Sequence, residues 1–359
     1  MRICFLADGK SYHTQRWVDY FAQRGHDCHL VSLEGEIKTL ASQRVLKSLC
    51  PIQALNFLLV VPQVKTILKD FCPDLLNAHF ASAYGFTGAL TGFRPLVVSC
   101  WGSDILISPE KSFAHKMRVK YVLKKADLLT CDGRDLSKAV EHLGARKENI
   151  IVSPMGIDRK ILEKSADRKS SKPEFVILSA RKLEPVYHLE TLLLAASEVK
   201  KTYQEKVKFL ITGEGSQKQR LLRLSRELRI DHRVEFIGFL PRTDFLDIFK
   251  KADLYVSTSV SDSTSVALLE AMALGLIPIV TDIPGNREWV REGENGFLFP
   301  PKDFRTLAEK IIWCIRNFDR LDTIREKNLS LVREKALWEN NMAGIEKGFL
   351  ELIEKKEHA

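Results

Sequence analysis

The stretch Ser261–Val280, "SDSTSVALLEAMALGLIPIV", has a polar start, an apolar centre and a short β-type end. A helical pattern begins near Thr264 or Ser265 and runs to Ala273, and Gly275 follows as a stop signal. The closing "IPIV" and the preceding "DLYVSTS" have the composition of buried strands. Strand, helix and strand in this order predict a parallel sheet flanked by helices.

Two carboxylates lie in this stretch, Asp262 before the predicted helix and Glu270 inside it. At about 1.5 Å per residue, Glu270 lies roughly 9 Å further along the helix axis than Thr264, so the two acids cannot act on one proton. This spacing disfavours a glycosidase-type pair and suits two contacts to one extended ligand. The free amides of Ser265 and Val266 would form a seat for phosphate between them. The alternatives are a helix N-cap for Asp262 and a solvent-facing helix residue for Glu270.

The same alternation of short apolar runs and helical segments extends over the whole chain and predicts two α/β units. A polar segment rich in Ser and Lys at 163–174 is typical of a linker. We expect an N-terminal domain at 1–165, a second domain at 172–335 and a closing helix at 336–359. Ligands of such sheets bind at the carboxyl ends of the strands, so the cleft between the units is the expected site. The runs that predict strands are "ICFLA", "CHLVSL", "LLNAHF", "LVVSCW", "LLTC", "EFVILSA", "KFLITG", "VEFIGF", "LYVSTS" and "IPIVTD".

Composition narrows the function classes. The chain has 359 residues, 45% of them apolar, and we find no apolar run long enough to span a bilayer. Its start is typical of a buried strand rather than a signal peptide, so we expect a cytoplasmic protein. The seven cysteines lack the spacing of a zinc or disulfide framework, and we expect them to be reduced core residues.

A net charge of +9 points to an anionic partner, but basic and aromatic residues do not interleave as in a nucleic-acid surface. The densest basic stretch, 111–126, holds six Lys or Arg and no acid. As a helix it would place Phe113, Met117, Tyr121 and Leu123 near one side, which suits the surface of an anionic membrane. The alternative is a solvated helix whose apolar side packs inward.

Two phosphate-binding motifs are incomplete. "GKS" at 9–11 lacks the earlier glycine of a nucleotide-triphosphate loop, because Cys4 stands there. "TGEGSQK" supplies Gly213 and Gly215 after a strand, but Lys218 replaces the third glycine of a dinucleotide fingerprint. We interpret it as a tight turn near the ligand, which disfavours an oxidoreductase.

With these motifs the chain resembles the retaining glycosyltransferases of the GT-B fold, specifically the GT4 group. The family signature has two Glu residues separated by seven positions, a glycine-rich middle and an "EAMA-G-P-V" helix and strand. Glu270 and "EAMALGLIPIV" match it, whereas Asp262 replaces the first Glu and "STS" replaces the glycines. Further similar segments are "HTQRWVDYFAQRGHDCHLVS", "NAHF", "WGSD", "MGID", "SARKLEP", "TGEGS", "TDIPGNREWV" and "GENGFLFPPKD".

The resemblance implies two Rossmann-like domains facing a central cleft, with a nucleotide diphosphate sugar held by the second. It assigns the donor sugar to Asp262, the diphosphate to the amides of Ser265 and Val266, and the ribose to Glu270. A carboxylate can pair two neighbouring hydroxyls, which fits both acids. Gly213, Gly215 and Glu288 match positions near the donor.

The resemblance also assigns a catalytic arginine, Arg181, which would stabilise the departing diphosphate. The family usually has a Lys five or six residues later, but Val186 and Tyr187 stand there. Lys182 is a candidate stand-in, although neighbours on an extended strand point to opposite faces. A surface salt bridge is the alternative for Arg181.

In the first domain His79 matches a family histidine near the reacting sugar, where it would act as a catalytic hydrogen-bond donor. Asp104 matches an acid on the acceptor side, and Gly9 and His13 lie where the family has an acceptor-side or phosphate-side loop. The alternatives are a satisfied core residue for His79 and a loop cap for Asp104.

The implied function is retaining transfer of a sugar from a UDP- or GDP-linked donor to a glycan or lipid-linked acceptor, in cell-surface polysaccharide or glycolipid synthesis. The resemblance implies no metal and no cofactor besides the donor substrate. The same fold also allows a nucleotide-sugar epimerase, a glycan phosphorylase or a non-catalytic sugar- or lipid-binding scaffold. The Asp262 substitution and the missing Lys favour the scaffold among these alternatives.

Overall fold

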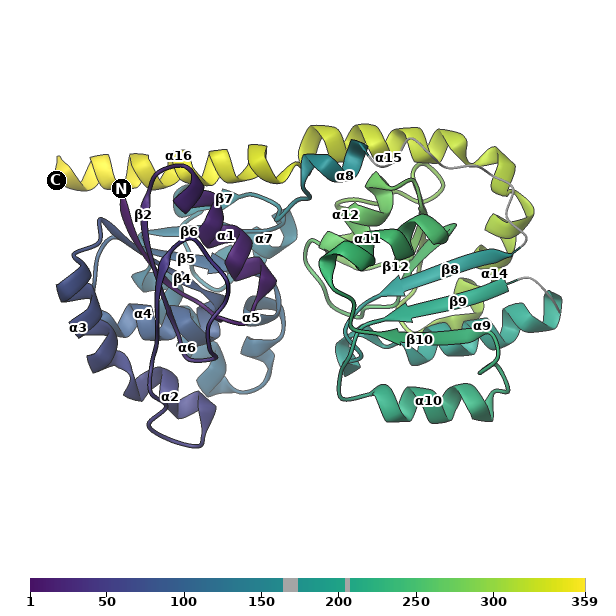
Figure 1. Ribbon diagram of the computed structural model, residues 1–359, viewed down its shortest axis with the longest axis horizontal. Helices are drawn as coiled ribbons and strands as arrows, with labels where there is room; N and C mark the ends of the chain where they lie inside the picture. Colours follow the sequence, from purple (N-terminus) through teal and green to yellow (C-terminus); the bar gives the residue numbers. More distant parts are fainter. Residues whose placement is uncertain (164–173, 204–206, 359) are drawn as a thin grey trace. The chain divides into compact units, whose positions relative to one another are not determined.

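The computed structural model describes residues 1–163, 174–203 and 207–358, and it divides into two compact units (Figure 1). The first unit comprises Met1–Pro154 and Asn340–Ala359, and the second comprises Met155–Glu339. Of the predicted linker at 163–174, residues 164–173 lie outside the described residues, as do the expected domain boundaries at 165 and 172.

The first unit is built on a parallel sheet, seven-stranded in the described residues, with the order β3-β2-β1-β4-β5-β6-β7. Helices cover the sheet, as expected for parallel strands, which are buried on both faces. The strands are β1 Arg2–Leu6, β2 Asp27–Ser32, β3 Ser42–Val45, β4 Leu75–His79, β5 Leu96–Cys100, β6 Leu128–Cys131 and β7 Ile150–Val152. The helices are α1 Tyr12–Gln23, α2 Gln53–Leu59, α3 Val61–Phe71, α4 Gly85–Thr91, α5 Ser103–Leu106, α6 Phe113–Lys125, α7 Arg134–His142 and α16 Trp338–Glu357.

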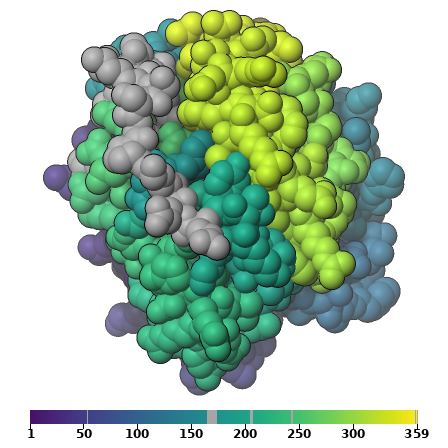
Figure 2. Space-filling view, turned by 90° about the vertical axis from the view of Figure 1, so that its right-hand side faces the viewer, coloured from purple at the N-terminus to yellow at the C-terminus, as the bar shows by residue number. Residues whose placement is uncertain are grey.

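The second unit repeats the plan with a parallel sheet, six-stranded in the described residues, in the order β10-β9-β8-β11-β12-β13. One apolar cluster lies on each face of the sheet. The helix α14 packs against α9, and the two helices lie side by side in Figure 2. The strands are β8 Phe175–Ala180, β9 Val207–Thr212, β10 Val234–Gly238, β11 Leu254–Ser257, β12 Ile277–Thr281 and β13 Phe297–Phe299. The helices are α8 Arg159–Glu163, α9 Glu190–Thr202, α10 Lys218–Glu227, α11 Arg242–Lys251, α12 Val266–Ala273, α13 Pro284–Arg287, α14 Phe304–Arg316 and α15 Asp322–Lys335.

The α/β class, the parallel sheets and all ten predicted strands are confirmed. The structure adds β3, β7 and β13, each of which lies at an edge of its sheet. β3 and β7 are short and partly exposed, so they lack the continuous apolar run that marks an interior strand.

The helix α16 ties the end of the chain to the first unit. Its Glu346 is buried and accepts a hydrogen bond from Tyr20 Oη at 3.1 Å. The same carboxylate lies 2.5 Å from Arg24 Nε and 2.7 Å from His26 Nε2. Phe349 stacks on Phe21 with ring centroids 5.3 Å apart. A buried charge with three partners and an aromatic pair fix this helix to α1 and to the turn that follows it.

No helix in the described part of the chain is long and apolar enough to cross a membrane. All seven cysteines are free thiols. Five are buried as predicted, but Cys72 is exposed and Cys50 is half-buried, so the expectation of seven core cysteines is wrong at these two positions.

Candidate active site

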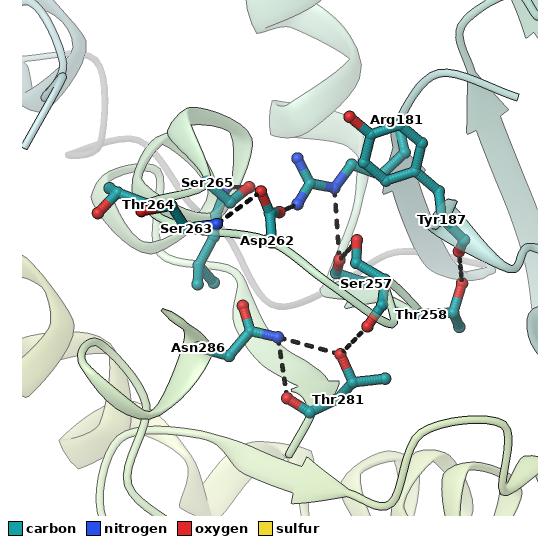
Figure 3. A network of polar contacts seen from close by, with 12 residues as sticks. Arg181, Tyr187, Ser257, Thr258, Asp262, Ser263, Thr264, Ser265, Thr281 and Asn286 are labelled. Carbon is teal, nitrogen blue, oxygen red and sulfur yellow. Dashed lines mark hydrogen bonds and ion pairs between the residues drawn. The ribbon is translucent and has the colours of Figure 1, made fainter. Parts of the chain in front are cut away.

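Arg181 and Asp262 form an ion pair in the second unit (Figure 3). Arg181 follows β8 directly, and Asp262 lies in the loop that leads from β11 to α12. Because β8 and β11 are neighbours in the sheet, the two loops meet at its carboxyl edge although 81 positions separate them. Arg181 Nε also donates to Ser257 Oγ at 3.4 Å. Both charged groups are largely shielded from solvent, so each provides the countercharge that the other needs.

Tyr187 covers the guanidinium of Arg181, with the ring centroid 5.0 Å from its central carbon. The carbonyl of Tyr187 accepts from Thr258 Oγ1 at 2.7 Å, and this bond holds the ring beside β11 (Figure 3). An aromatic ring therefore stands in the region where the family usually has a lysine. Lys182, the expected stand-in, has an exposed side chain, and the structure does not bring it to the Arg181–Asp262 pair.

The helix α12 begins where the sequence predicts. Ser265 is its N-cap, and its Oγ accepts from Leu268 N at 3.2 Å. Asp262 is not the cap; its Oδ1 accepts from Ser263 N at 3.1 Å and its other oxygen faces Arg181. The first-turn amide of Val266 has no acceptor within the helix, as at every helix start. A cation and a helix N-terminus thus lie on either side of Asp262.

Glu270 is buried inside α12, with 1% of its surface exposed, so the solvent-facing alternative is wrong. Tyr255 of β11 is also fully buried. Burial raises the pKa of the Tyr255 phenol, the positive charge of Arg181 opposes that rise, and the negative charge of Glu270 adds to it. Tyr255 is therefore close enough to both Arg181 and Glu270 for each charge to affect its pKa. Sequence reasoning missed it, since an aromatic residue in a strand is typical of any core.

Three glycines allow the loops around Arg181 and Asp262 to approach closely. A Cβ on Gly213 would lie 2.2 Å from the carbonyl oxygen of Arg181, and Gly213 has a φ of +121°. A Cβ on Gly215 would lie 2.4 Å from the carbonyl oxygen of Leu183. "TGEGSQK" is therefore a tight turn packed against the backbone that carries Arg181.

The third glycine, Gly285, allows the segment after β12 to approach the backbone of Asp262. A Cβ on Gly285 would lie 2.5 Å from the carbonyl oxygen of Asp262. Trp289 Nε1 donates to Thr264 Oγ1 at 3.3 Å, so the segment after β12 is held against the start of α12. Glu288 lies on this segment and is half-buried. Gly285 and Trp289 belong to "TDIPGNREWV", but only the position of Glu288 was singled out from the sequence.

In the first unit His79 ends β4 and is 1% exposed. Its Nε2 lies 3.1 Å from Asn77 Oδ1, and its ring packs against Trp17 and Trp101 at 5.2 and 4.8 Å. Burial lowers the pKa of His79 to about 3, so the ring is neutral. Nδ1 has no hydrogen-bond partner among the described residues. A neutral imidazole with one uncommitted nitrogen can exchange one hydrogen bond with a ligand.

Asp104 is buried and accepts hydrogen bonds from the backbone amides of Ala81, Trp101 and Gly102 at 2.8 to 3.1 Å. Burial raises its pKa to about 6 against the opposing effect of these bonds. These contacts are those of the loop-cap alternative, and the acceptor-side role of Asp104 stays a prediction. Asp104 fixes the backbone that positions Trp101.

A cavity of about 360 Å³ lies in the first unit, and both His79 and Trp101 line it. Trp101 Nε1 is buried without a partner among the described residues. His13 on α1 packs beside Trp101, with centroids 5.9 Å apart. Gly9 donates from its amide to Ser32 Oγ at 2.7 Å, and a Cβ there would lie 1.9 Å from the carbonyl oxygen of Gly35. Gly9 is thus required for the close approach of two loops.

Comparison with known proteins assigns the family. The profile of the family described as "Glycosyl transferases group 1" matches residues 160–329, and that of "Glycosyl transferase 4-like" matches residues 2–133. The chain is a GT4 glycosyltransferase. The two matches together span most of its length and fall one on each unit.

Individual relatives of this glycosyltransferase are distant. The colanic acid biosynthesis glycosyltransferase WcaL of Salmonella typhimurium, whose name carries the word putative, is 24% identical over 80% of this chain and 72% of its own length. The structure of HepE from Anabaena in complex with UDP-glucose superposes with a TM-score of 0.80 at 22% identity, over 98% of this chain and all of that one. Sucrose-phosphate synthase from Thermosynechococcus elongatus gives a TM-score of 0.83 at 16% identity, over 98% of both chains. These structures establish the GT-B fold of the enzyme.

Proposed function

We propose that this glycosyltransferase moves a sugar from a UDP-linked donor to a lipid-linked or glycan acceptor, with retention of anomeric configuration. The observation that carries the proposal is the shielded Arg181–Asp262 pair beside the N-terminus of α12. A cation and free helix amides are suited to a diphosphate, and a carboxylate is suited to sugar hydroxyls. One nucleotide sugar can engage all three.

Donor binding would exchange the partners of the ion pair. Arg181 would turn from Asp262 to the diphosphate, and the carboxylate of Asp262 would accept hydrogen bonds from the donor sugar. The buried Glu270 would accept from the ribose hydroxyls. The diphosphate would replace Asp262 as the partner of Arg181, and the sugar hydroxyls would replace Arg181 as the partner of Asp262. Neither charged side chain would then be buried without a partner.

Transfer would then proceed on one face of the sugar. The acceptor hydroxyl oxygen forms a bond to the anomeric carbon while the bond from that carbon to the diphosphate oxygen breaks. The electron pair of the broken bond stays on the diphosphate, which also takes the hydroxyl proton. Arg181 and the first-turn amides of α12 stabilise the charge that develops on the leaving group. His79, neutral at physiological pH, would donate or accept a hydrogen bond at a sugar hydroxyl.

The relatives support the biological part of the proposal. HepE is described in complex with UDP-glucose, which favours UDP as the base of the donor. WcaL is named for colanic acid biosynthesis, which favours assembly of a cell-surface polysaccharide or glycolipid. We extend both features to this enzyme as part of the proposal.

The basic helix α6 supports a peripheral position on an anionic membrane. Phe113 and Met117 are 79% and 48% exposed, and Tyr121 lies one turn further along the same side. Leu123 is buried beside Val119 and Val122, so its predicted place among the exposed residues is wrong. Exposed aromatic and basic side chains on one helix suit an interface of headgroups and acyl chains. Sedimentation with phosphatidylglycerol vesicles tests this position.

The direct test is transfer to an acceptor followed by NMR. A thermal-shift screen over UDP-, GDP- and ADP-sugars first identifies the donor, because a ligand that binds the folded state raises its stability. We expect UDP-sugars to give the largest shift and the NMR coupling of the product to show the donor's anomeric configuration. An inverted product would contradict the mechanism. Isomerised donor without acceptor would show an epimerase, a requirement for inorganic phosphate would show a phosphorylase, and the absence of both turnover and donor binding would show a scaffold.

A further inference from the structure

The cavity of the first unit has an uneven charge distribution. Lys111, His115 and Arg118 line one part of it. These residues are spaced by four and three positions, so they lie on one side of α6 and the turn before it. Among the described residues no carboxylate forms an ion pair with any of the three. Arg118 donates to the carbonyl of Ser82 at 3.5 Å and lies over the ring of Phe86, neither of which neutralises its charge. The positive charges of Lys111 and Arg118 are therefore available to an anionic ligand, and His115 adds a ring nitrogen that can form a hydrogen bond.

The carboxylates that line the cavity come from the other end of the sheet edge. Asp8 follows β1 and Glu34 follows β2, whereas α6 follows β5, and β4 lies between the two groups in the strand order. His79, which ends β4, and Trp101, which follows β5, line the part of the cavity between these two groups. Carboxylates, a neutral imidazole and an aromatic ring are groups that bind sugars. Lys111 and Arg118, at the other end of the cavity, are suited to bind an anionic group of the same ligand.

Two of the helices that line the cavity, α2 and α6, also carry exposed apolar side chains. Ala54 and Phe57 of α2 line it, while Leu55 and Leu58 of the same helix are 45% and 48% exposed. On α6 the exposed Phe113 and Met117 alternate along the helix with the cavity-lining His115 and Arg118. Figure 1 shows α2 and α6 on the same side of the first unit. Exposed apolar side chains and basic side chains thus lie next to the same cavity.

We propose that the acceptor of this enzyme is a sugar linked through phosphate to a lipid, with the phosphate bound by Lys111, His115 and Arg118. The sugar lies toward His79 and Trp101, and the start of the lipid chain lies over the exposed side chains of α2 and α6. This inference rests on the proposed transferase function and specifies its acceptor. A lipid phosphate fits better than a protein partner, since a flat protein surface would leave the cations of the cavity unused.

The test uses the full chain and farnesyl diphosphate as a soluble probe, measured by calorimetry. We expect binding that Lys111→Glu weakens about tenfold, the value of one charge-assisted hydrogen bond. The matched control is Lys116→Glu, the same charge change at an exposed position of α6 that does not line the cavity. We expect this control to bind the probe as the unchanged protein does. Equal loss in both variants would overturn the site in favour of general electrostatic attraction.

Three further arms separate the parts of the proposal. Farnesol binding as tightly as farnesyl diphosphate would overturn the phosphate contact, and inorganic pyrophosphate binding as tightly would overturn the lipid contact. Saturating UDP and Arg181→Ala should both leave probe binding intact, because a loss would place the diphosphate at the donor site. None of these measurements needs turnover. A failed probe assay with intact transfer would therefore reject the lipid phosphate alone, and probe binding without transfer would reject the proposed reaction alone.

Discussion

Two buried polar groups at the carboxyl ends of the sheets, Arg181 in the second unit and His79 in the first, differ in charge. In the second unit Arg181, Asp262 and Glu270 keep their charges out of solvent. In the first unit burial keeps His79 neutral, between the rings of Trp17 and Trp101. The difference shows how one α/β plan can serve two ligands. The fixed charges around Arg181 suit a diphosphate, whose charge changes during the reaction, whereas the neutral and aromatic surroundings of His79 suit a sugar hydroxyl.

The largest effect is expected for Arg181→Ala. Loss of one group that stabilises a leaving group lowers kcat by about 10²- to 10³-fold. Arg305→Ala, at an exposed position of α14, should leave kcat unchanged. Arg181→Ala also leaves Asp262 without its countercharge, so we expect a lower melting temperature that Asp262→Asn restores without restoring transfer. Full activity of Arg181→Ala in a steady-state assay would place the diphosphate elsewhere.

His79 should make the protein sensitive to acid. Its folded pKa of about 3 lies below the ordinary value of 6.5, so its contribution to stability is complete above pH 6.5 and is lost as the pH falls toward 3. The loss amounts to about 1.4 kcal/mol per pH unit in this window. Urea unfolding from pH 7 to 4 should show a shallower pH dependence in His79→Gln than in the unchanged protein. The exposed His142→Gln is the control, and parallel curves for His79→Gln and the unchanged protein would refute the buried neutral state.

Glu270→Gln should weaken donor binding and spare the chemical step. Removing the charge from a hydrogen bond to ribose should raise the donor KM about tenfold with little change in kcat. Glu309→Gln, on the exposed side of α14, provides the comparison. A lower kcat at unchanged KM would move Glu270 from the ribose to the reacting centre.

The smallest effect is expected at Tyr187. Tyr187→Ala removes the ring over the guanidinium of Arg181, and we expect kcat to fall about threefold, the effect of a cation–π contact at a partly exposed site. Tyr187→Phe keeps the ring and should retain activity. If both variants lose activity equally, the hydroxyl rather than the ring is responsible.

The interior of the fold could be predicted from the sequence because an interior parallel strand needs an apolar run on both faces. The edge strands β3 and β7 have no such requirement and were not predicted. The polar residues Thr264 and Ser265 predict the start of α12, and Gly275 predicts its end. In the structure the N-cap is Ser265.

The geometry of the candidate site could be predicted only in part. The local pattern before α12 identifies Asp262 and the family resemblance identifies Arg181, but their ion pair depends on the adjacency of β8 and β11, which no local pattern records. The burial of Tyr255 and the loop-cap contacts of Asp104 likewise depend on neighbours distant in sequence. Lys111 lines the cavity although the sequence shows only that it lies in a basic stretch.

The position of α16 bears on how the protein is made. The first unit contains Asn340–Ala359 as well as Met1–Pro154, and the whole second unit intervenes between these segments. During synthesis Glu346 therefore leaves the ribosome after the second unit is complete. Until then Tyr20, Arg24 and His26 cannot form their contacts with Glu346. The second unit can fold as its strands emerge, whereas the first can finish only after Asn340–Ala359 has been synthesised. Deleting Asn340–Ala359 should thus impair the unit that is synthesised first.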